Sequence, residues 1–321
     1  MSYLYFIGID ISKDSFEVAC YNQPDTPRTQ QFSNNKSGFA QFIKTLEHSI
    51  THYFITLEAT GGYEQNLLFY LCQNKLATHR LQTLKSSHYM RSLRVYGKND
   101  VLDAEALARF GAERHATLPL FSMPSTAMIM LQKLQARRDD LIVINVAEKQ
   151  RLKHPTYDDM APSILRHCAF IKQELAEIEV KMAEIINQNH LLRQKKEIMM
   201  RFKGIGEQTS CVLLTICPEL GTLTRRAIAA LAGVAPHPRE SGVYQGYRST
   251  KGGRSQIKRA LFMAALSAKT HDPKLKAFFN GLVARGKKKM VALTATMRKM
   301  IVILNAQIRD FLIDQRPQQH T

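Results

Sequence analysis

The sequence predicts an α/β N-terminal domain, an α-helical coiled-coil middle and a mainly α-helical C-terminal domain. Three observations predict this order. Short apolar segments alternate with amphipathic ones over the first hundred residues, a stretch with helical periodicity follows Pro124, and glycine-rich and basic segments concentrate beyond residue 198. With 321 residues, of which 45% are hydrophobic, the chain is long and apolar enough for two or three domains. We place them at residues 1–124, 125–197 and 198–321.

The N-terminal domain begins with three predicted strands, separated by turn-forming residues. The predicted elements are strands at Tyr3–Ile9, Phe16–Tyr21 and Arg28–Phe32, a helix over Lys36–Ser49, a strand at Tyr53–Leu57, a helix over Tyr63–Asn74 and a strand near His79–Leu84. Three strands followed by strand–helix alternation predict a mixed sheet covered by helices. Ribonuclease-H-like folds use this order.

The middle of the chain is predicted to hold two long helices. The first runs from Ser125 to Lys153, before a His-Pro break. In the second, apolar residues spaced alternately by four and three form a seam of three heptads, at Ile171, Leu175, Ile178, Met182, Ile185 and Leu192. Asn189 occupies one slot of this seam, where a polar residue can fix register or oligomeric state. The pattern fits an intramolecular helical hairpin and an intermolecular coiled coil equally.

Positive charge is concentrated in the C-terminal part. The net charge is +18, from 45 Lys and Arg against 27 Asp and Glu, and residues 236–321 hold 17 of the former and 4 of the latter. A local excess of this kind is typical of surfaces that bind nucleic-acid phosphates. Gly204-Ile205-Gly206, before an apolar segment, predicts a helix-hairpin-helix whose second helix turns its N-terminal amides to a phosphate. Many helices nevertheless begin after Gly-x-Gly for packing reasons alone.

Cysteine and hydropathy patterns exclude several other classes of protein. The five cysteines are scattered and form no CxxC pair, which argues against a disulfide framework and a zinc site. No apolar stretch approaches about 18 residues, and the N-terminus lacks a basic leader with a cleavage site. We expect a soluble, cytoplasmic protein with reduced thiols and no membrane partner.

Four acidic residues are candidate metal ligands. Asp10 and Glu58 each stand at the end of an apolar strand, and Asp100 and Asp103 lie three apart on one face of a predicted helix. Gathering like charges is unfavourable unless a cation binds them, and hard cations such as Mg²⁺ take oxygen ligands and promote phosphoryl transfer. The order of these residues therefore predicts a Mg²⁺ site. Three further acids are expected to face solvent or to cap turns: Asp14, Glu64 and Glu105.

A glycine-rich loop that opens at Ser241-Gly242 carries candidate nucleophiles among basic side chains. A flexible backbone among guanidinium groups can approach phosphates and pair them closely, and these cations would ease attack of Ser241 on phosphorus. By residue pattern alone the competitors are Tyr244, Tyr247, Ser249 and Ser255. The candidate nucleic-acid-binding side chains are Arg239, Arg248, Lys251, Arg254, Lys258, Arg259, Lys287, Lys288 and Lys289.

Together, these motifs resemble the IS-one-ten family of insertion-sequence transposases, which are related to the Piv and MooV invertases. The matching stretches are Gly8-Ile9-Asp10-Ile11-Ser12-Lys13, Leu57-Glu58-Ala59-Thr60-Gly61-Gly62-Tyr63, Lys98-Asn99-Asp100-Val101-Leu102-Asp103-Ala104-Glu105-Ala106, Gly204-Ile205-Gly206, and Gly233-Val234-Ala235-Pro236 through Ser241-Gly242 to Gly252-Gly253-Arg254. The resemblance covers nearly the whole chain. Asn99 and Val101 stand where Thr and Arg are common in the family, and neither residue is among those that carry the chemistry.

The resemblance implies a RuvC-like (ribonuclease-H-like) N-terminal domain, whose Asp-Glu-Asp-Asp set of Asp10, Glu58, Asp100 and Asp103 holds Mg²⁺. It also implies a coiled-coil middle and a C-terminal transposase domain with Ser241 as nucleophile. The family moves its element as a circular double-stranded intermediate, guided by a structured noncoding bridge RNA that pairs with target and donor DNA. The implied protein is a prokaryotic, nucleoid-associated site-specific DNA recombinase. It would work through a phosphoserine intermediate, as a dimer, or as a tetramer when two DNAs are synapsed.

Two other functions fit part of the pattern. A RuvC-like endonuclease or Holliday junction resolvase would use the metal site and water alone, so Ser241 would be incidental and no covalent adduct would form. An architectural or RNA-binding protein with a decayed metal site is the second, and the presence of all four acids argues against it.

Overall fold

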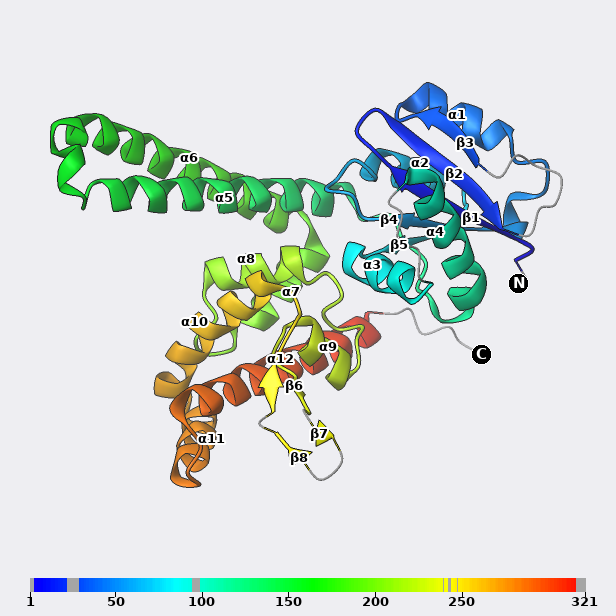
Figure 1. The fold of residues 1–321 in the computed structure, drawn as a ribbon. Coiled ribbons are helices and arrows are strands. Elements are labelled where there is room, and N and C mark those ends of the chain that lie inside the picture. Colours follow the sequence, from blue (N-terminus) through cyan, green and yellow to red (C-terminus); the bar gives the residue numbers. More distant parts are fainter. Residues whose placement is uncertain are drawn as a thin grey trace. The chain divides into compact units, whose positions relative to one another are not determined.

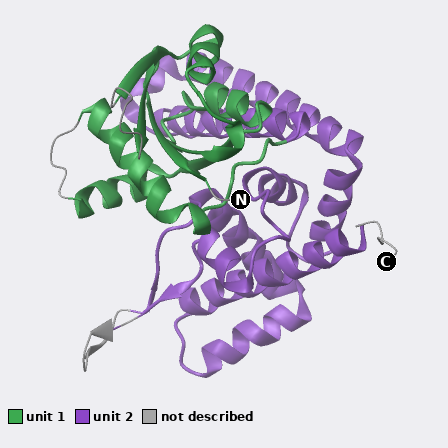
Figure 2. Ribbon diagram, turned by 90° about the vertical axis from the view of Figure 1, so that its right-hand side faces the viewer, with its two compact units in different colours: residues 1–124 green, residues 125–321 purple. Residues whose placement is uncertain are grey.

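The structure is a computed structural model that describes residues 3–21, 29–93, 99–238, 240–241, 244–246 and 248–315, with the backbone alone at 240, 241, 244 and 245. The chain divides into two compact units, residues 1–124 and residues 125–321 (Figure 2). Each unit has its own cluster of buried apolar side chains.

The described part of unit 1 is built on a five-stranded mixed sheet with the order β3-β2-β1-β4-β5 (Figure 1). The strands are β1 Tyr5–Ile11, β2 Ser15–Tyr21, β3 Thr29–Ser33, β4 Tyr53–Glu58 and β5 Ala77–Leu81. β1, β2 and β3 pair antiparallel, whereas β4 runs parallel to β1 and β5 parallel to β4. These antiparallel and parallel pairs confirm the predicted mixed sheet. The parallel strands are joined by crossover connections, which contain helices.

Helices cover both faces of this sheet. They are α1 Lys36–Lys44, α2 Gln65–Gln73, α3 Thr83–Ser92 and α4 Asp100–Arg114, with 3₁₀ turns at Ile50–His52 and His115–Thr117. α1 and α2 share an apolar cluster with the odd-numbered residues of β1. Gly8 and Asp10 point to the opposite face, because side chains alternate along a strand. α4 covers that face, and a Cβ added at Gly8 would lie less than 3.0 Å from backbone atoms of Ala104 and Ala108.

Two predicted elements of unit 1 differ from the structure by more than two residues at one end. The helix expected over Lys36–Ser49 ends at Lys44, where the Thr45 hydroxyl donates to the carbonyl of Phe42 at 2.7 Å. The strand expected near His79–Leu84 lies at Ala77–Leu81, because α3 begins at Thr83.

Unit 2 consists mainly of helices. They are α5 Thr126–Arg151, α6 Ala161–Gln188, α7 His190–Met200, α8 Glu207–Ile216, α9 Arg225–Leu231, α10 Ser255–His271, α11 Pro273–Ala284 and α12 Lys289–Asp314, with a 3₁₀ turn at Pro155–Met160. The described residues between α9 and α10 form two short pairs of strands, β6 Pro236–His237 with β9 Ser249–Thr250, and β7 Glu240–Ser241 with β8 Tyr244–Gln245. One apolar cluster includes residues from α5 through α12. A separate domain over 125–197 stays a prediction, since that segment shares its core with the C-terminal helices.

α12 is a core helix of unit 2. In the part of the chain that the structure describes, it is the one helix long and apolar enough to cross a membrane by length and composition alone. Its residues Met300 and Leu304 have no exposed surface. Asn305 ties it to the turn before α9, accepting from the Gly221 amide at 2.9 Å and donating to the Leu223 carbonyl at 2.8 Å. α12 is therefore apolar because much of it is buried in the core of unit 2.

α5 and α6 lie side by side as a helical hairpin (Figure 1). The seam residues Ile171, Ile178 and Met182 are buried within this single chain, and Arg138 of α5 donates to Glu179 of α6 at 2.9 Å. The heptad seam is therefore occupied by intramolecular packing, which is one of the two arrangements that the pattern fits.

The seam does not continue through Asn189. α6 ends one residue before it and α7 begins one residue after it, and the Asn189 backbone between them is extended, with φ −101° and ψ 109°. Its side-chain oxygen accepts from the Leu192 amide at 3.1 Å. Asn is favoured at such N-cap positions because its side chain satisfies a free helical N–H. The prediction that Asn189 lies in a continuous seam is wrong, because it caps α7.

α7, residues 201–206 and α8 form the predicted pair of helices around Gly204-Ile205-Gly206. Gly204 has φ +100°, and a Cβ there would lie 2.5 Å from the carbonyl oxygen of Ala264 in α10. Packing against α10 therefore accounts for this glycine. Phosphate binding at the N-terminus of α8 stays a prediction.

Candidate active site

Asp10 and Glu58 stand at the carboxyl ends of two neighbouring parallel strands. β1 and β4 are paired in register up to the residue before each acid. Both acids face α4, because Gly8 and Thr56, two residues earlier on each strand, lie against that helix. Both side chains are half-buried. The two carboxyl groups therefore share one edge and one face of the sheet.

Asp100 and Asp103 occupy the first turn of α4. Because α4 packs with Ala104 directly over Gly8, this turn lies beside Asp10, two residues further along β1. Asp100 is exposed and Asp103 is half-buried. The positive end of the helix dipole favours carboxylates in a first turn. The packing of one glycine thus brings both helical acids to the strand-end acids.

The four acids interact electrostatically. Burial raises the pKa of Asp10 from 3.8 to about 6, and the charges of Asp103, Asp100 and Glu58 add to this rise. A backbone hydrogen bond at Ile11 opposes it. Burial is the largest of these causes, and the contributions of the other three acids place them within electrostatic range of Asp10. The structure therefore places all four predicted acids within electrostatic range of one another, at the ends of β1 and β4 and in the first turn of α4.

The cluster suits a hard divalent cation by its chemistry. Its donors are all carboxylate oxygens, and a bound cation would offset the repulsion that acts on Asp10. In the described ranges no three His, Cys, Asp or Glu side chains converge closely enough to hold a metal ion as they stand. Ligation by the four acids therefore requires their side chains to turn towards a common point.

A further acid, Glu17, lies directly opposite Asp10 across the antiparallel β1–β2 pair. Residues opposed in this way point to the same face of a sheet. Glu17 is half-buried, and the residues on either side of it are buried. In the sequence, the signal that could have identified Glu17 is its place between the apolar residues Phe16 and Val18 of a predicted strand. Of the acids expected to face solvent or to cap turns, Asp14 is exposed and Glu105 is half-buried.

Glu64 holds the loop after β4 from a buried position, so of its two expected roles the solvent-facing one is wrong and the turn-capping one is confirmed. Its side chain has no exposed surface. One oxygen accepts from Arg80 Nε at 3.0 Å, and the other from the backbone amides of Thr60 and Gly62 at 3.1 and 2.9 Å. Burial alone would raise the pKa of Glu64, but these donors outweigh it and the pKa ends below its ordinary value. The carboxylate thus fixes the turn that immediately follows Glu58.

Asn34 links the loops that follow β1 and β4. Its side-chain nitrogen lies 3.0 Å from the carbonyl oxygen of Ser12, 3.3 Å from that of Lys13 and 3.3 Å from that of Tyr63. The two loops that follow Asp10 and Glu58 are therefore joined outside the strand ladder. Sequence reasoning missed this link because an Asn just before a helix is an ordinary turn residue.

Ser241 lies in β7, within the segment between α9 and α10. Its backbone pairs with Tyr244 across β7 and β8, while β6 and β9 pair nearer the helices (Figure 1). Of the competing nucleophiles, Ser249 lies in β9 and Ser255 begins α10. Tyr247 lies outside the described residues. Ser241 is thus carried on a hairpin beyond the helical core.

The base of this segment is closed by backbone contact between glycines. A Cβ at Gly253 would lie less than 3.0 Å from backbone atoms of Gly233, and one at Gly233 would lie as close to the carbonyl oxygen of Gly252. Gly233 and Gly253 have φ values of +65° and +76°, which favour glycine. The chain therefore leaves the helices and returns to them at one point.

Arg254, predicted to bind nucleic acid, is engaged by the protein. Its guanidinium donates to both carboxylate oxygens of Glu219, at 2.6 and 2.7 Å, and to the Ile216 carbonyl at 2.6 Å. Bidentate pairs of this geometry are the strong form of Arg–carboxylate interaction. In this structure Arg254 anchors the start of α10.

The other predicted nucleic-acid-binding side chains differ in exposure. Lys258 is half-buried, and its amine lies 3.4 Å from the Thr250 hydroxyl. Arg239 lies outside the described residues. The exposed ones are Arg248, Lys251, Arg259, Lys287, Lys288 and Lys289.

Similar proteins indicate the family of this chain. Residues 7–155 match the DEDD transposase family model of IS110, and residues 196–280 match the Transposase IS116/IS110/IS902 family. The chain is 27% identical over 318 residues to the pilin gene-inverting proteins of Moraxella lacunata and Moraxella bovis, with 95% of each chain covered. It is 25% identical over 288 residues to an uncharacterized 43.6 kDa protein of insertion element IS110 from Streptomyces coelicolor, which covers 84% of this chain and 68% of that relative.

The two family matches contain the two halves of the candidate site. The first includes Asp10, Glu58, Asp100 and Asp103, and the DEDD family suggests the use of a divalent metal. The second includes Ser241. The chain therefore belongs to the IS110 family of transposases and is a DNA transposase or site-specific recombinase.

Proposed function

We propose that this protein cuts and rejoins DNA through a phosphoserine intermediate at Ser241, with Mg²⁺ held by Asp10, Glu58, Asp100 and Asp103. The observation that carries the metal half is geometric: Asp10 and Glu58 end neighbouring parallel strands, and Asp100 and Asp103 occupy the first turn of the helix that packs over them. The serine half is supported by the family match over residues 196–280 and by the exposed cations beside the hairpin that carries Ser241.

The proposed reaction keeps the energy of the broken DNA phosphodiester bond in a new ester bond between the phosphate and serine. The Ser241 oxygen attacks phosphorus, a bond forms between them, and the bond from phosphorus to one sugar oxygen breaks. The serine proton ends on that leaving oxygen. Attack by a sugar hydroxyl of another strand reverses these steps, so strand exchange needs no ATP. When bound, Mg²⁺ would neutralise charge that develops on the phosphate oxygens.

The sheet order supports a RuvC-like, ribonuclease-H-like unit 1. Three antiparallel strands followed by two parallel ones, with acids at the ends of β1 and β4, is the arrangement expected for that fold. In this proposal unit 1 supplies the metal site and unit 2 the nucleophile. A site composed from two protomers is consistent with that division, and it would make a dimer the smallest active form, with a tetramer to synapse two DNAs.

A bridge RNA is proposed as the guide. The support is the basic C-terminal part, whose net charge of +13 over residues 236–321 suits backbone binding while base pairing reads the sequence. The two related pilin gene-inverting proteins are named for DNA inversion, which is site-specific recombination. The proposed location is the prokaryotic cytoplasm, at the nucleoid.

Covalent trapping tests the proposal. The protein is purified from cells that carry the gene with its native flanks, bound RNA is sequenced, and DNA adducts are trapped with Mg²⁺. An adduct is expected for wild type and for Ser249→Ala, and none for Ser241→Ala. A flank-derived RNA is expected in the purified material. An adduct that persists in Ser241→Ala would contradict the serine assignment.

A composite site has its own test. Ser241→Ala and Asp10→Ala proteins are each inactive in the proposal, and mixing them would restore one complete site in a heterodimer only if serine and acids come from different protomers. Recovered strand transfer supports a composite site, and an inactive mixture with proven subunit exchange argues for a site within one protomer.

A metal-dependent endonuclease or junction resolvase is the second candidate. The observation that favours it is that all four acids lie within unit 1, so a metal site made of them would not need the serine loop. This candidate predicts Mg²⁺-dependent cleavage without an adduct, retained in Ser241→Ala and lost in Asp10→Ala.

A further inference from the structure

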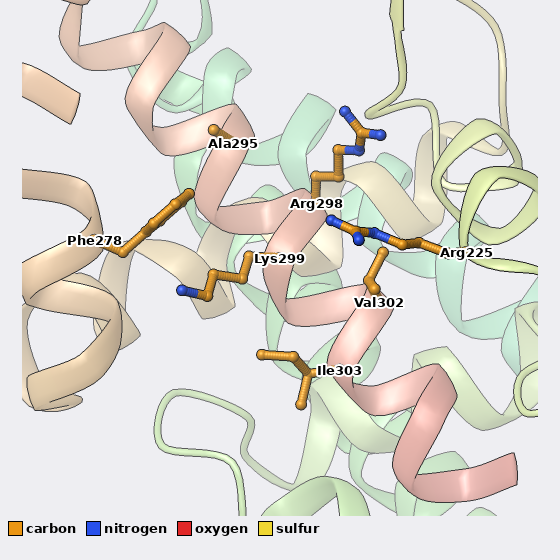
Figure 3. A pocket seen from close by; sticks show the side chains of 7 residues that line it. All are labelled: Arg225, Phe278, Ala295, Arg298, Lys299, Val302 and Ile303. Atoms are coloured by element: carbon orange, nitrogen blue, oxygen red, sulfur yellow. The ribbon is translucent and has the colours of Figure 1, made fainter. Parts of the chain in front are cut away.

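A cationic groove runs between α9, α11 and α12 of unit 2 (Figure 3). Its volume is about 520 Å³. Three of its lining residues are cations, Arg225, Arg298 and Lys299, and the rest are apolar. None of these cations was among the nucleic-acid-binding residues that the sequence predicted. The groove is assembled from segments up to 78 residues apart in the chain, which hides it from sequence patterns.

The three cations are arranged around the groove. Arg225 reaches from the first turn of α9 towards Arg298 on α12, while Lys299 points towards α11 (Figure 3). The Lys299 ammonium lies 4.2 Å from the centre of the Phe278 ring. The ion pairs formed among the described residues include none of the three. Their charges therefore create a local positive potential that an anion would lower.

The walls of the groove are held by the core beneath them. Asn305, on the buried side of α12, bonds both Gly221 and Leu223 in the turn before α9. Thr224 then caps α9, its hydroxyl accepting from the Ala227 amide at 3.2 Å. The position of Arg225 relative to α12 is thus fixed by the hydrogen bonds of Asn305 and by the Thr224 cap.

The floor between the cations is apolar. It is formed by Ala295, Val302 and Ile303 of α12 and by the half-buried Phe278 of α11. A duplex keeps its base faces stacked inside and would offer this floor only backbone. A single strand exposes base faces that pack on apolar and aromatic surface while its phosphates meet cations. Charge and floor together fit the single strand.

We propose that this groove binds a single-stranded segment of nucleic acid, with phosphates at Arg225 and Arg298 and a base on the floor beside Phe278. This rests on the proposed function, in which the protein handles DNA and RNA. The groove would be a nucleic-acid-binding site additional to the cations that the sequence predicted near the Ser241 hairpin and at Lys287–Lys289.

The test is equilibrium binding of the full-length protein to labelled dT12, to rU12 and to a 12-base-pair duplex, by fluorescence anisotropy over a range of salt without divalent metal. Arg225→Ala/Arg298→Ala is compared with the matched control Arg226→Ala/Lys276→Ala, which removes two exposed cations from α9 and α11 outside the groove. We expect single-strand binding to weaken about tenfold in the groove variant, with a salt slope lower by about 1.4, roughly 0.7 for each phosphate that is no longer neutralised. The control is expected to change affinity less than threefold.

The location is tested independently with wild-type protein. A dT12 strand carrying 5-iodouracil is irradiated on the protein, and the crosslinked peptide is expected to contain Phe278. The relative loss for dT12 and rU12 shows which strand the groove prefers, and a selective loss for either supports the proposal.

Three results would overturn the proposal: equal losses in the groove variant and the control, an equal loss of duplex binding, or a crosslink that maps outside α11 and α12. If the groove binds a protein partner instead, neither variant would lose single-strand affinity, which also overturns the proposal. Because this assay needs neither Mg²⁺ nor Ser241, its failure leaves the adduct result intact, and a missing adduct leaves the binding result intact.

Discussion

Glu64 and Arg80 form an ion pair in which the carboxylate is wholly buried and the guanidinium side chain is 42% exposed. The pair connects β5 to the loop after β4, and the same carboxylate accepts two amides of that loop. A buried carboxylate is tolerated only when such donors replace its water. The turn beyond Glu58 is therefore fixed by charge as well as by packing.

Glu64→Gln is expected to lower the free energy of unfolding by about 2–3 kcal/mol. One amide oxygen cannot accept from Arg80 and from both loop amides at once. We also expect a higher Mg²⁺ concentration for half-maximal DNA cleavage, because the loop beyond Glu58 loosens. Urea unfolding and a Mg²⁺ titration measure the two effects, with Glu105→Gln as the control. An unchanged Mg²⁺ requirement in a destabilised Glu64→Gln protein would limit Glu64 to a structural role.

Asp10→Asn is expected to stabilise the fold at pH 7 while abolishing DNA cleavage. With a pKa of about 6 against 3.8 ordinarily, folded Asp10 keeps a proton that the unfolded chain releases, so stability falls as pH rises from about 4 to 6. A shift of two pKa units corresponds to about 2.7 kcal/mol, which solvent screening at this half-buried site reduces to about 1–2 kcal/mol.

The gain from Asp10→Asn should therefore be full at pH 7 and disappear below pH 4, measured by urea unfolding without divalent metal. Asp14→Asn, at an exposed carboxylate, is the control and should show neither the gain nor its pH dependence. An Asp10→Asn protein less stable than wild type at pH 7 would show that the carboxylate is stabilising and that the four acids do not repel as described.

Gly8→Ala is expected to destabilise unit 1 by about 3 kcal/mol, because its methyl group would meet the backbone of α4. Displacement of α4 would also carry Asp100 and Asp103 away, so the pKa of Asp10 should fall towards its ordinary value. NMR titration of the Asp10 carboxyl measures this shift. Gly281→Ala, in a helix with open space at that position, is the control and should raise stability by up to about 1 kcal/mol.

Arg254 and Glu219 are expected to couple by about 1–3 kcal/mol in a double-mutant cycle of Arg254→Ala and Glu219→Ala, measured by unfolding. Arg259→Ala, at an exposed cation, is expected to weaken DNA binding with little effect on stability. A coupling energy near zero, together with a strong loss of DNA affinity in Arg254→Ala, would return Arg254 to the phosphate-binding set.

The sequence predicted what periodicity and order encode. Strand–helix alternation gave the mixed sheet, and acids at two strand ends and on one helix gave a cluster that the structure brings together. These features depend on local spacing, and long-range packing of α4 on the sheet, closest at Gly8, gathers them.

What the sequence could not predict depends on partners distant in the chain. The sequence left Glu64 either facing solvent or capping a turn, and its burial could not be foreseen because its compensating donor, Arg80, lies on the next strand. Asn189 matches a heptad slot because a helix cap and a seam position can fall at the same spacing. Arg254 resembles its exposed neighbours in composition, and only Glu219, 35 residues earlier, distinguishes it.

The contact between Gly233 and Gly253 allows the segment between these glycines to evolve independently of the helices. Since the chain exits and returns at one point, residues can be exchanged, added or removed inside that closure with little penalty to the helical packing outside it. The segment that carries Ser241 can therefore change in length and composition while the helices stay as they are. The segment between the two glycines is therefore a unit that could be exchanged with that of a distant relative.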